Sequence, residues 1–333
     1  MRKDLVSYFL VCCSFNCFGQ NGVRKSFEFL QVANNARLTA LGGKNVSLRD
    51  RDINFFYSNP SVISDTLSGQ AAAGYQFYIA DVGQATFTYV HTFSGIGTLA
   101  FGVQHLNYGT IKGYDPTGAE VGEFKSGEAL LSVSKSHQLS NFRLGATMKL
   151  AFSNVAGYRA NALLLDLGGL FIHPSQDWTI GLVIKNFGVV LSEYSATSKT
   201  KLPFDVECGT TFKPEHMPMR FSLTAYGFTK QDGYYDPQSG VPEPGTLDKV
   251  LRNFNFGAEV LVHRNADVLI GYNYRLHQEL KLEETGGAAG FSFGFSLHIK
   301  SFELTCSRST YVSGNAGYAF TLSKNIDKML KRL

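Results

Sequence analysis

Apolar residues occupy every second position in many stretches of this chain. One stretch places them at Phe142, Leu144, Ala146, Met148, Leu150 and Phe152, and another at Phe291, Phe293, Phe295, Leu297 and Ile299. Successive side chains of a strand point to opposite faces, so a period of two predicts strands with one apolar face. Stretches of about ten residues can also cross a bilayer at a tilt. Two folds fit this pattern: a membrane barrel with its apolar face in lipid, and a soluble sandwich with that face in a core.

The composition is typical of a barrel protein. The 333 residues are 44% hydrophobic and only 17% charged, with 34 glycines and 13% aromatic residues. Barrel strands use glycine at bends and aromatic residues at the lipid boundary. After the first twenty residues there is no apolar run of eighteen, which argues against membrane-spanning helices. The net charge of +4 is not gathered into a basic stripe, so we expect no nucleic-acid partner.

The first nineteen residues read as a secretory signal peptide, residues 1–19. A basic start at Met1-Arg2-Lys3 precedes an apolar stretch from Leu5 to Phe18, and small residues precede Gln20. A lipoprotein signal and a buried element of the mature chain are the alternatives. Removal of the signal leaves Cys208 and Cys306, which we expect to be free, although a disulfide between them remains open. No cysteine or histidine spacing predicts a metal site.

Fourteen strand candidates follow from residue 69. Their approximate ranges are 69–80, 84–94, 97–108, 124–136, 141–153, 158–172, 177–190, 203–213, 219–230, 252–263, 266–277, 287–299, 301–309 and 315–323. Bacterial single-chain barrels of the outer membrane have an even number of strands. The count therefore favours an all-β, antiparallel transmembrane barrel of fourteen strands.

The lengths of the connections alternate in the way that a membrane barrel requires. The long connections, 109–123, 191–202, 231–251 and 278–286, are all odd-numbered, whereas most even-numbered connections are short turns. Outer-membrane barrels have short periplasmic turns and long extracellular loops, and a soluble sandwich has no reason for this sorting. We therefore expect a bacterial outer-membrane location, with the long loops extracellular and both termini periplasmic.

Residues 20–67 lack the alternation and read as an N-terminal plug, or hatch, for a barrel over 68–323, with a periplasmic tail at 324–333. The run Arg49, Asp50, Arg51 and Asp52 is a candidate latch that holds the plug in the lumen. Its candidate partners are the lumen-facing residues Lys149, Lys185, Glu259 and Arg275. The alternative is an exposed run whose charges compensate one another.

Several segments resemble the PorV/PorQ family of the type IX secretion system. These are Phe27-Glu28-Phe29-Leu30, the run from Ala36 to Gly43, Asp52, Asn59-Pro60, the run from Leu99 to Gly109, Gly113-Tyr114-Asp115 and Gly317-Tyr318-Ala319-Phe320. The later segments look most like the PorQ-like members, and the resemblance spans essentially the whole mature chain. The basic tail at 324–333 departs from it, because barrels often end on an aromatic residue. The family is distantly similar to the fourteen-stranded FadL fatty-acid transporters, so the resemblance implies a FadL-like barrel.

The resemblance implies a role in binding rather than in catalysis. PorQ-like proteins are thought to hold a PorZ-like surface protein, which works with PorU and PorV to process secreted cargo and anchor it. The sequence carries no catalytic motif and implies no cofactor and no metal. The alternatives are a FadL-like transporter of hydrophobic small molecules and a soluble secreted β-sandwich.

Two of the long loops carry the candidate residues for a partner. The longest loop contains Tyr234, Tyr235 and Asp236, and the loop at 109–123 contains Tyr114 and Asp115. Tyrosine is enriched at the energetic centres of protein interfaces. The alternative is that these tyrosines belong to the aromatic belt at the membrane surface.

Overall fold

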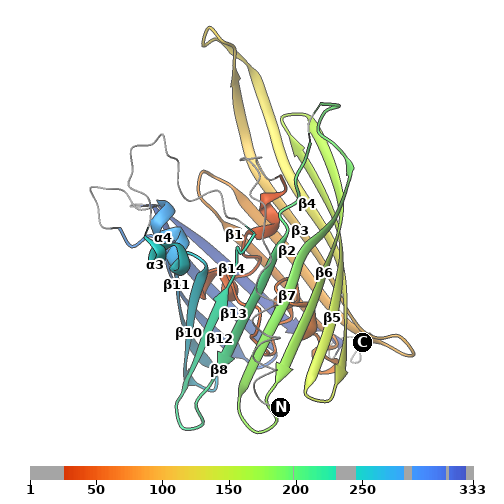
Figure 1. Cartoon of the computed structure of the whole chain (residues 1–333), viewed down its shortest axis with the longest axis vertical. Helices are drawn as coiled ribbons and strands as arrows, with labels where there is room; N and C mark the ends of the chain where they lie inside the picture. The colour runs from red at the N-terminus through yellow and green to blue at the C-terminus, as the bar shows by residue number, and fades with distance from the viewer. Residues whose placement is uncertain (1–25, 198, 230–244, 281–286, 313–314, 328–333) are drawn as a thin grey trace, which may run out of the picture.

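The computed structural model of the chain is a closed antiparallel barrel of fourteen strands. It describes residues 26–197, 199–229, 245–280, 287–312 and 315–327. Each strand pairs with its neighbours in sequence, and β1 pairs with β14 to close the barrel (Figure 1). The fourteen-stranded barrel predicted from the alternation is therefore confirmed, and the soluble sandwich is wrong. The signal peptide and residues 328–333 of the tail lie outside the described residues.

Most strands begin and end within a few residues of the positions predicted from the sequence. They are β1 (Gln70–Phe77), β2 (Gly83–Phe93), β3 (Gly97–Tyr114), β4 (Glu120–Leu139), β5 (Phe142–Val155), β6 (Tyr158–Ile172), β7 (Trp178–Ser192), β8 (Asp205–Phe212), β9 (Met219–Ala225), β10 (Phe254–His263), β11 (Ala266–Asn273), β12 (Phe291–Ile299), β13 (Phe302–Val312) and β14 (Asn315–Asn325). The turns that follow the even-numbered strands gather at one end of the barrel, here called the short-turn end (Figure 1). The other end is called the long-loop end.

The first long connection is mostly strand, which corrects the prediction of a loop over 109–123. β3 and β4 stay paired from Leu99 and Lys135 out to Tyr114 and Glu120. The pairing of β3 with β2 stops at Asn107, so the outer part forms a two-stranded ribbon, residues 108–126, that projects beyond the rim (Figure 1). Charged and glycine residues indicated a loop, but a ribbon with two solvated faces accommodates them.

Two other strands end earlier than predicted. β9 stops at Ala225, and Gly227 follows with a φ of 74°. β11 stops at Asn273, where the helix α4 (Tyr274–Leu280) begins. The Asn273 side chain accepts a hydrogen bond from the backbone N–H of Leu276 at 3.1 Å, so it caps this helix in place of a strand continuation. A second short helix, α3 (Thr246–Leu251), ends the connection before β10.

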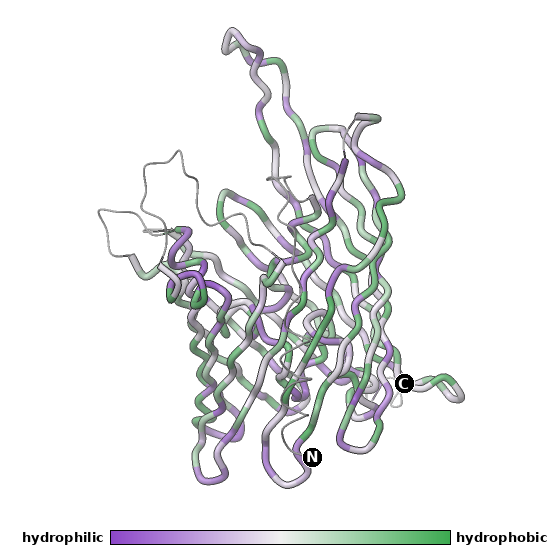
Figure 2. Tube along the Cα trace, in the orientation of Figure 1, coloured by the Kyte–Doolittle hydropathy of each residue, from purple (hydrophilic) through white to green (hydrophobic). Residues whose placement is uncertain are grey.

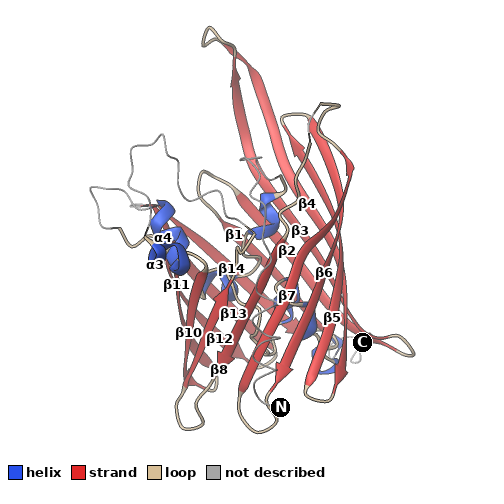
Figure 3. Ribbon diagram, viewed as in Figure 1, coloured by secondary structure: helices blue, strands red, loops and turns tan. Residues whose placement is uncertain are grey.

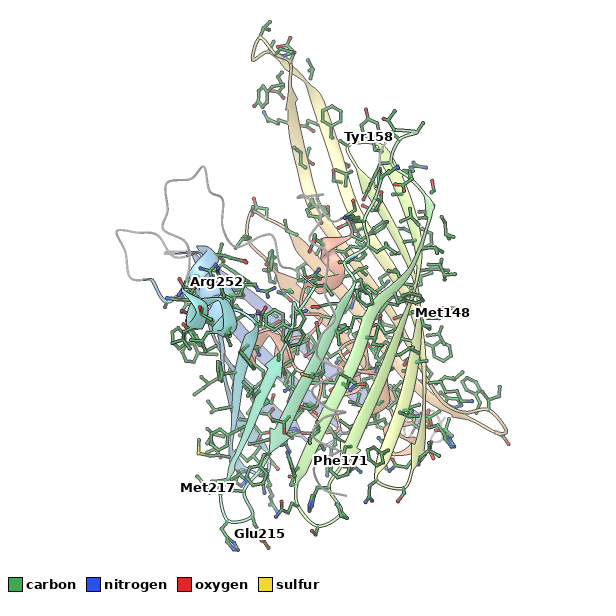
Figure 4. The ribbon with its side chains drawn as sticks, viewed as in Figure 1. Met148, Tyr158, Phe171, Glu215, Met217 and Arg252 are labelled. Carbon is green, nitrogen blue, oxygen red and sulfur yellow. The ribbon has the colours of Figure 1, made fainter. Side chains whose placement is uncertain are left out.

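The outward face of the barrel is apolar. Met148 on β5 is 56% exposed and points away from the barrel at mid-height (Figure 4). The apolar residues alternate with polar ones along the strands (Figure 2). No helix among the described residues is long and apolar enough to span a membrane. Because lipid tolerates apolar side chains and rejects charge, this exterior fits a bilayer.

Residues 26–69 fill the lumen and form the plug. They contain the helix α2 (Ala36–Ala40) and four 3₁₀ turns, η1 (Glu28–Gln31), η2 (Ile53–Tyr57), η3 (Pro60–Val62) and η4 (Asp65–Leu67), which lie inside the barrel (Figure 3). Side chains cap these short elements, since Asn35 accepts from the N–H of Leu38 and Asn59 accepts from that of Ser61. The plug also has an apolar core that includes Leu41, Phe55 and Phe56.

The two cysteines of the mature chain are not bonded to each other. Cys208 on β8 and Cys306 on β13 are both free thiols.

Candidate functional site

A ring of four charged side chains, two of them buried and two partly buried, joins the plug to the barrel wall. Arg37 of α2 contacts Asp50 at 2.7 Å and Glu259 of β10 at 2.8 Å. Arg220 of β9 contacts the same two acids, at 2.9 and 2.7 Å. The signs alternate around the ring and sum to zero, with one arginine and one acid on each side of the interface.

The register of the wall explains why this ring closes. Arg220 and Glu259 are direct partners in the β9–β10 ladder, so their side chains lie together on the lumen face. Asp50 is partly shielded from water, which opposes its ionisation, but the two arginines outweigh this effect and hold the pKa of Asp50 well below its usual range. Asp50 therefore stays ionised within the ring.

A second ionic cluster joins the plug to β7 and β8, on the strands next to β9. Lys44 of the plug contacts Glu207 of β8 at 3.0 Å, and Lys185 of β7 approaches the same carboxylate at 3.8 Å. Beside it, Lys149 pairs with Asp166 on the neighbouring strand, within the wall. The plug is thus held by charge at two separate places.

Hydrogen bonds from the wall occupy the carbonyls at the end of α2. The amide of Asn255 donates to the carbonyls of Leu41 at 2.8 Å and Lys44 at 2.7 Å. The amide of Asn273 donates to the carbonyl of Gly42 at 3.1 Å. These three carbonyls lie in the turn that follows α2, so the wall amides fix the path of the plug after the helix.

Glycines on the lumen face let the plug backbone approach the wall. A Cβ at Gly271 would lie 2.1 Å from the backbone N of Gly42, and one at Gly181 would lie 2.1 Å from the carbonyl O of Val46. A Cβ at Gly145 would lie 2.5 Å from the backbone of Pro60. We call Gly145, Gly181 and Gly271 the glycine seats, because no other residue leaves this space.

The predicted latch residues have different environments. Asp50 belongs to the ring, and Asp52 is buried and accepts from the N–H and the side-chain amide of Asn54, both at 2.9 Å. Arg49 and Arg51 are exposed, and neither forms an ion pair with a described residue. Of the four candidate wall partners, Glu259 contacts the plug directly.

Arg275 does not lie on the lumen face of a strand, so that prediction is wrong. It belongs to α4, and its guanidinium lies 4.6 Å from the ring centre of Tyr226. Sequence reasoning missed Arg37 and Arg220 as parts of the latch. An available signal was that Arg37 is the one charged residue of an otherwise small and apolar run, and that Arg220 occupies a lumen-facing position of its strand.

The carboxyl group of Asp52 is a pH-sensitive element of the plug. Burial, together with the nearby charge of Glu303, raises the pKa of Asp52 to about 6. The folded plug therefore binds this proton more tightly than an unfolded chain, whose Asp pKa is about 4. Its contribution to stability is present below about pH 4 and is lost as the pH rises through about 6.

We expect Asp52→Asn to remove this pH dependence and to stabilise the plug at pH 7 by on the order of 2 kcal/mol. Asparagine keeps an acceptor for the Asn54 N–H. Hydrogen exchange of residues 53–57 at pH 5 and pH 7 measures the effect. Asp81→Asn, in the exposed turn after β1, is the control and should change neither profile.

Two cavities border the plug among the described residues. A cavity of about 20 Å³ lies between plug and wall and is lined by charged and polar groups that include Lys149, Lys185 and Glu207. A larger cavity of about 340 Å³ lies between the plug and α4. Tyr78, Tyr226 and Tyr311 line this vestibule, as the 340 Å³ cavity is named below.

Two of the candidate partner residues, Tyr114 and Asp115, belong to the described part of the chain, and both lie at the long-loop end. Tyr114 is 60% exposed near the tip of the ribbon. The side chain of Asp115 accepts hydrogen bonds from Thr117 and Ala119 and shapes the turn; these bonds hold the pKa of Asp115 below its usual value. Tyr234, Tyr235 and Asp236 lie outside the described residues. Among the described residues, no group of His, Cys, Asp and Glu could hold a metal ion.

Comparison with known proteins finds similarity in fold. No protein-family model matches the sequence, and no curated protein matches it. A TodX monoaromatic hydrocarbon channel with the deltaS2 mutation is similar in structure, with a TM-score of 0.54 and 13% identity over 89% of this chain and 99% of that one. The deltaS2S3 mutant of TodX gives a TM-score of 0.50 at 11% identity, over 87% and 98%. A Pseudomonas aeruginosa FadL homologue gives 0.47 at 11% identity, over 88% and 98%.

At these identities the similarity concerns the fold alone. The chain has a FadL-like barrel fold, and its exposed apolar exterior is suited to a lipid bilayer.

Proposed function

We propose that this chain is a non-enzymatic outer-membrane tether that holds a surface partner on its long-loop end. The observation that carries the proposal is the plug, which closes the lumen by two ionic clusters and by backbone contacts at the glycine seats. A barrel closed in this way offers its outer surface for function. The projecting ribbon supplies such a surface, with exposed Ile111 and Tyr114.

The resemblance to the PorV/PorQ family gives this proposal a specific form. In that form the partner is a PorZ-like protein of the type IX attachment complex, with PorU and PorV as further members, and the long-loop end faces outside. The ribbon contains Gly113-Tyr114-Asp115, one of the segments that carry the resemblance.

A FadL-like transporter of hydrophobic small molecules is the second candidate, and the fold fits it at least as well. The vestibule supports it, because three tyrosines line a cavity large enough for a small aromatic ligand. Charged residues, Glu28, Lys44, Arg275 and Glu279, line the same cavity. Transport also needs a route past the plug, and the 20 Å³ cavity provides too little space for a ligand.

Shortening the ribbon tests the tether. Replacement of residues 112–123 by Asn-Gly joins Ile111 to Phe124, which are already paired, through a two-residue hairpin turn. We expect the barrel to stay folded and the PorZ-like protein to be lost from the purified complex and from the cell surface. Co-purification in mild detergent and surface labelling of cells measure the two effects.

The matched control alters the opposite end of the barrel. Ile96→Ser changes an exposed apolar residue in the turn between β2 and β3, and it should leave the partner bound. Full retention of the PorZ-like protein by the shortened ribbon would count against this surface. Uptake of a labelled monoaromatic compound by cells, lost on deletion of the gene, would favour the transporter instead.

A further inference from the structure

A hollow with cationic and amide side chains lies on the outside of the barrel, away from the plug. It has a volume of about 610 Å³ and spans the four strands β3 to β6. Its floor is Gly127 and Ala129, whose small side chains create the depression. His105, Lys125 and Arg159 line it and are exposed.

The strand register gathers these residues into one site. Asn107, Gly127, Asn154 and Arg159 are successive partners across β3, β4, β5 and β6, and His105, Ala129, Phe152 and Asn161 form the adjacent row. Three asparagine side chains thus lie among the two cations, Lys125 and Arg159, and the imidazole of His105. The Oδ1 atom of Asn154 is buried and has no hydrogen-bond partner among the described residues.

The charges of this hollow are not neutralised within the described chain. Neither Lys125 nor Arg159 forms an ion pair with a described residue. Glu128, which borders the hollow, is 5% exposed and accepts a hydrogen bond from Tyr108 at 2.5 Å. On the ribbon, Glu123 is paired in register with Lys112. The hollow therefore presents a net positive surface with amide donors.

The position of the hollow relative to the apolar band indicates its ligand. On β5 the outward residues are apolar from Phe142 to Phe152, and the next outward residue is Asn154. The ten steps from Phe142 to Phe152, at about 3.3 Å each and tilted by about 40°, span about 25 Å, which is the height of the apolar band of such barrels. Asn154 and Arg159 therefore lie where the lipid head groups of the leaflet at the long-loop end begin.

We propose that this hollow binds the phosphorylated head group of a lipid in that leaflet. Lys125 and Arg159 pair with the phosphate, and the side-chain amides of Asn107, Asn154 and Asn161 donate to its oxygens or to a sugar hydroxyl. The exposed ring of Phe152 contacts the start of an acyl chain. This site is independent of the proposed tether and of the contents of the lumen.

Binding of a synthetic diphosphorylated lipid A to the detergent-purified full chain tests the site. Native mass spectrometry measures the fraction bound for the wild type, Lys125→Gln, Arg159→Gln and the double variant. A lysine or arginine near a lipid surface contributes about 1 kcal/mol, so we expect each substitution to weaken binding about five-fold, and both together about thirty-fold.

Lys135→Gln is the matched control, because Lys135 is exposed on the same face of β4 nearer the short-turn end. It should bind as the wild type does, and the dephosphorylated lipid should bind no better to the wild type than to the double variant. Excess inorganic phosphate should not displace the lipid, because the acyl contacts contribute to affinity. Equal binding by the wild type and the double variant overturns the proposal, as does an equal loss in Lys135→Gln. A shift in gel mobility on heating checks that every variant is folded.

Discussion

Arg37→Met should release the plug from the wall while leaving the barrel intact. The substitution leaves the buried Glu259 and the partly buried Asp50 with one arginine between them, so the ring carries an uncompensated negative charge. Removing one member of a buried ion pair costs about 3–5 kcal/mol. We expect faster hydrogen exchange throughout residues 36–57 and a higher ion conductance in planar bilayers than the wild type shows.

Arg51→Met is the control, since Arg51 is exposed and pairs with no described residue. It should leave both measurements unchanged. The double variant Arg37→Met with Glu259→Gln removes one charge of each sign and should recover part of the lost protection, as expected for residues that interact directly. Unchanged exchange in Arg37→Met would show that the ring does not hold the plug.

Gly271→Ala should also loosen the plug, although alanine is the better residue in an ordinary strand. Its Cβ would meet the backbone of Gly42 at 2.1 Å and of Leu41 at 2.3 Å, and neither can move aside as a side chain can. Overpacking of this kind costs about 1–3 kcal/mol. Gly181→Ala should act in the same way through the carbonyl of Val46.

Gly169→Ala is a control for which we expect no loss of stability. A Cβ there would meet only Leu144, at an ordinary 3.7 Å. Glycine within a strand costs about 0.5–1 kcal/mol relative to alanine, so this variant should be neutral or slightly more stable. Thermal unfolding, followed by the change in gel mobility on heating, and hydrogen exchange of residues 40–48 distinguish the variants at glycine seats from this control. Equal behaviour of Gly169→Ala and Gly271→Ala would contradict the steric account.

The barrel could be predicted from the sequence because its physical cause is local. Lipid on one face requires apolar residues at every second position, and the sorting of loop lengths distinguishes the barrel from a sandwich. The lumen position of Glu259 followed from the same alternation. The extension of β3 and β4 to Tyr114 and Glu120 could not be predicted from this alternation. The ribbon projects out of the lipid, so its residues need not alternate between apolar and polar.

The attachment of the plug could be predicted only in part, since it depends on contacts between distant segments. Asp50 was a candidate because it belongs to a charged run, whereas Arg37 pairs with Glu259 across 222 positions of the chain. The alternation places Gly271 on the lumen face and Gly169 on the outer face, but only the path of the plug shows that Gly271 lies against its backbone. Residues 26–69 carry no periodicity from which that path follows.

The glycine seats have a consequence for how the protein is assembled. They lie on β5, β7 and β11, on separate parts of the wall, and each is occupied by backbone from a different part of the plug. A finished barrel would have to admit all of these segments together through its mouth. We therefore expect the strands to close around a plug that is already in position, so that residues 26–69 act as an internal template for membrane insertion.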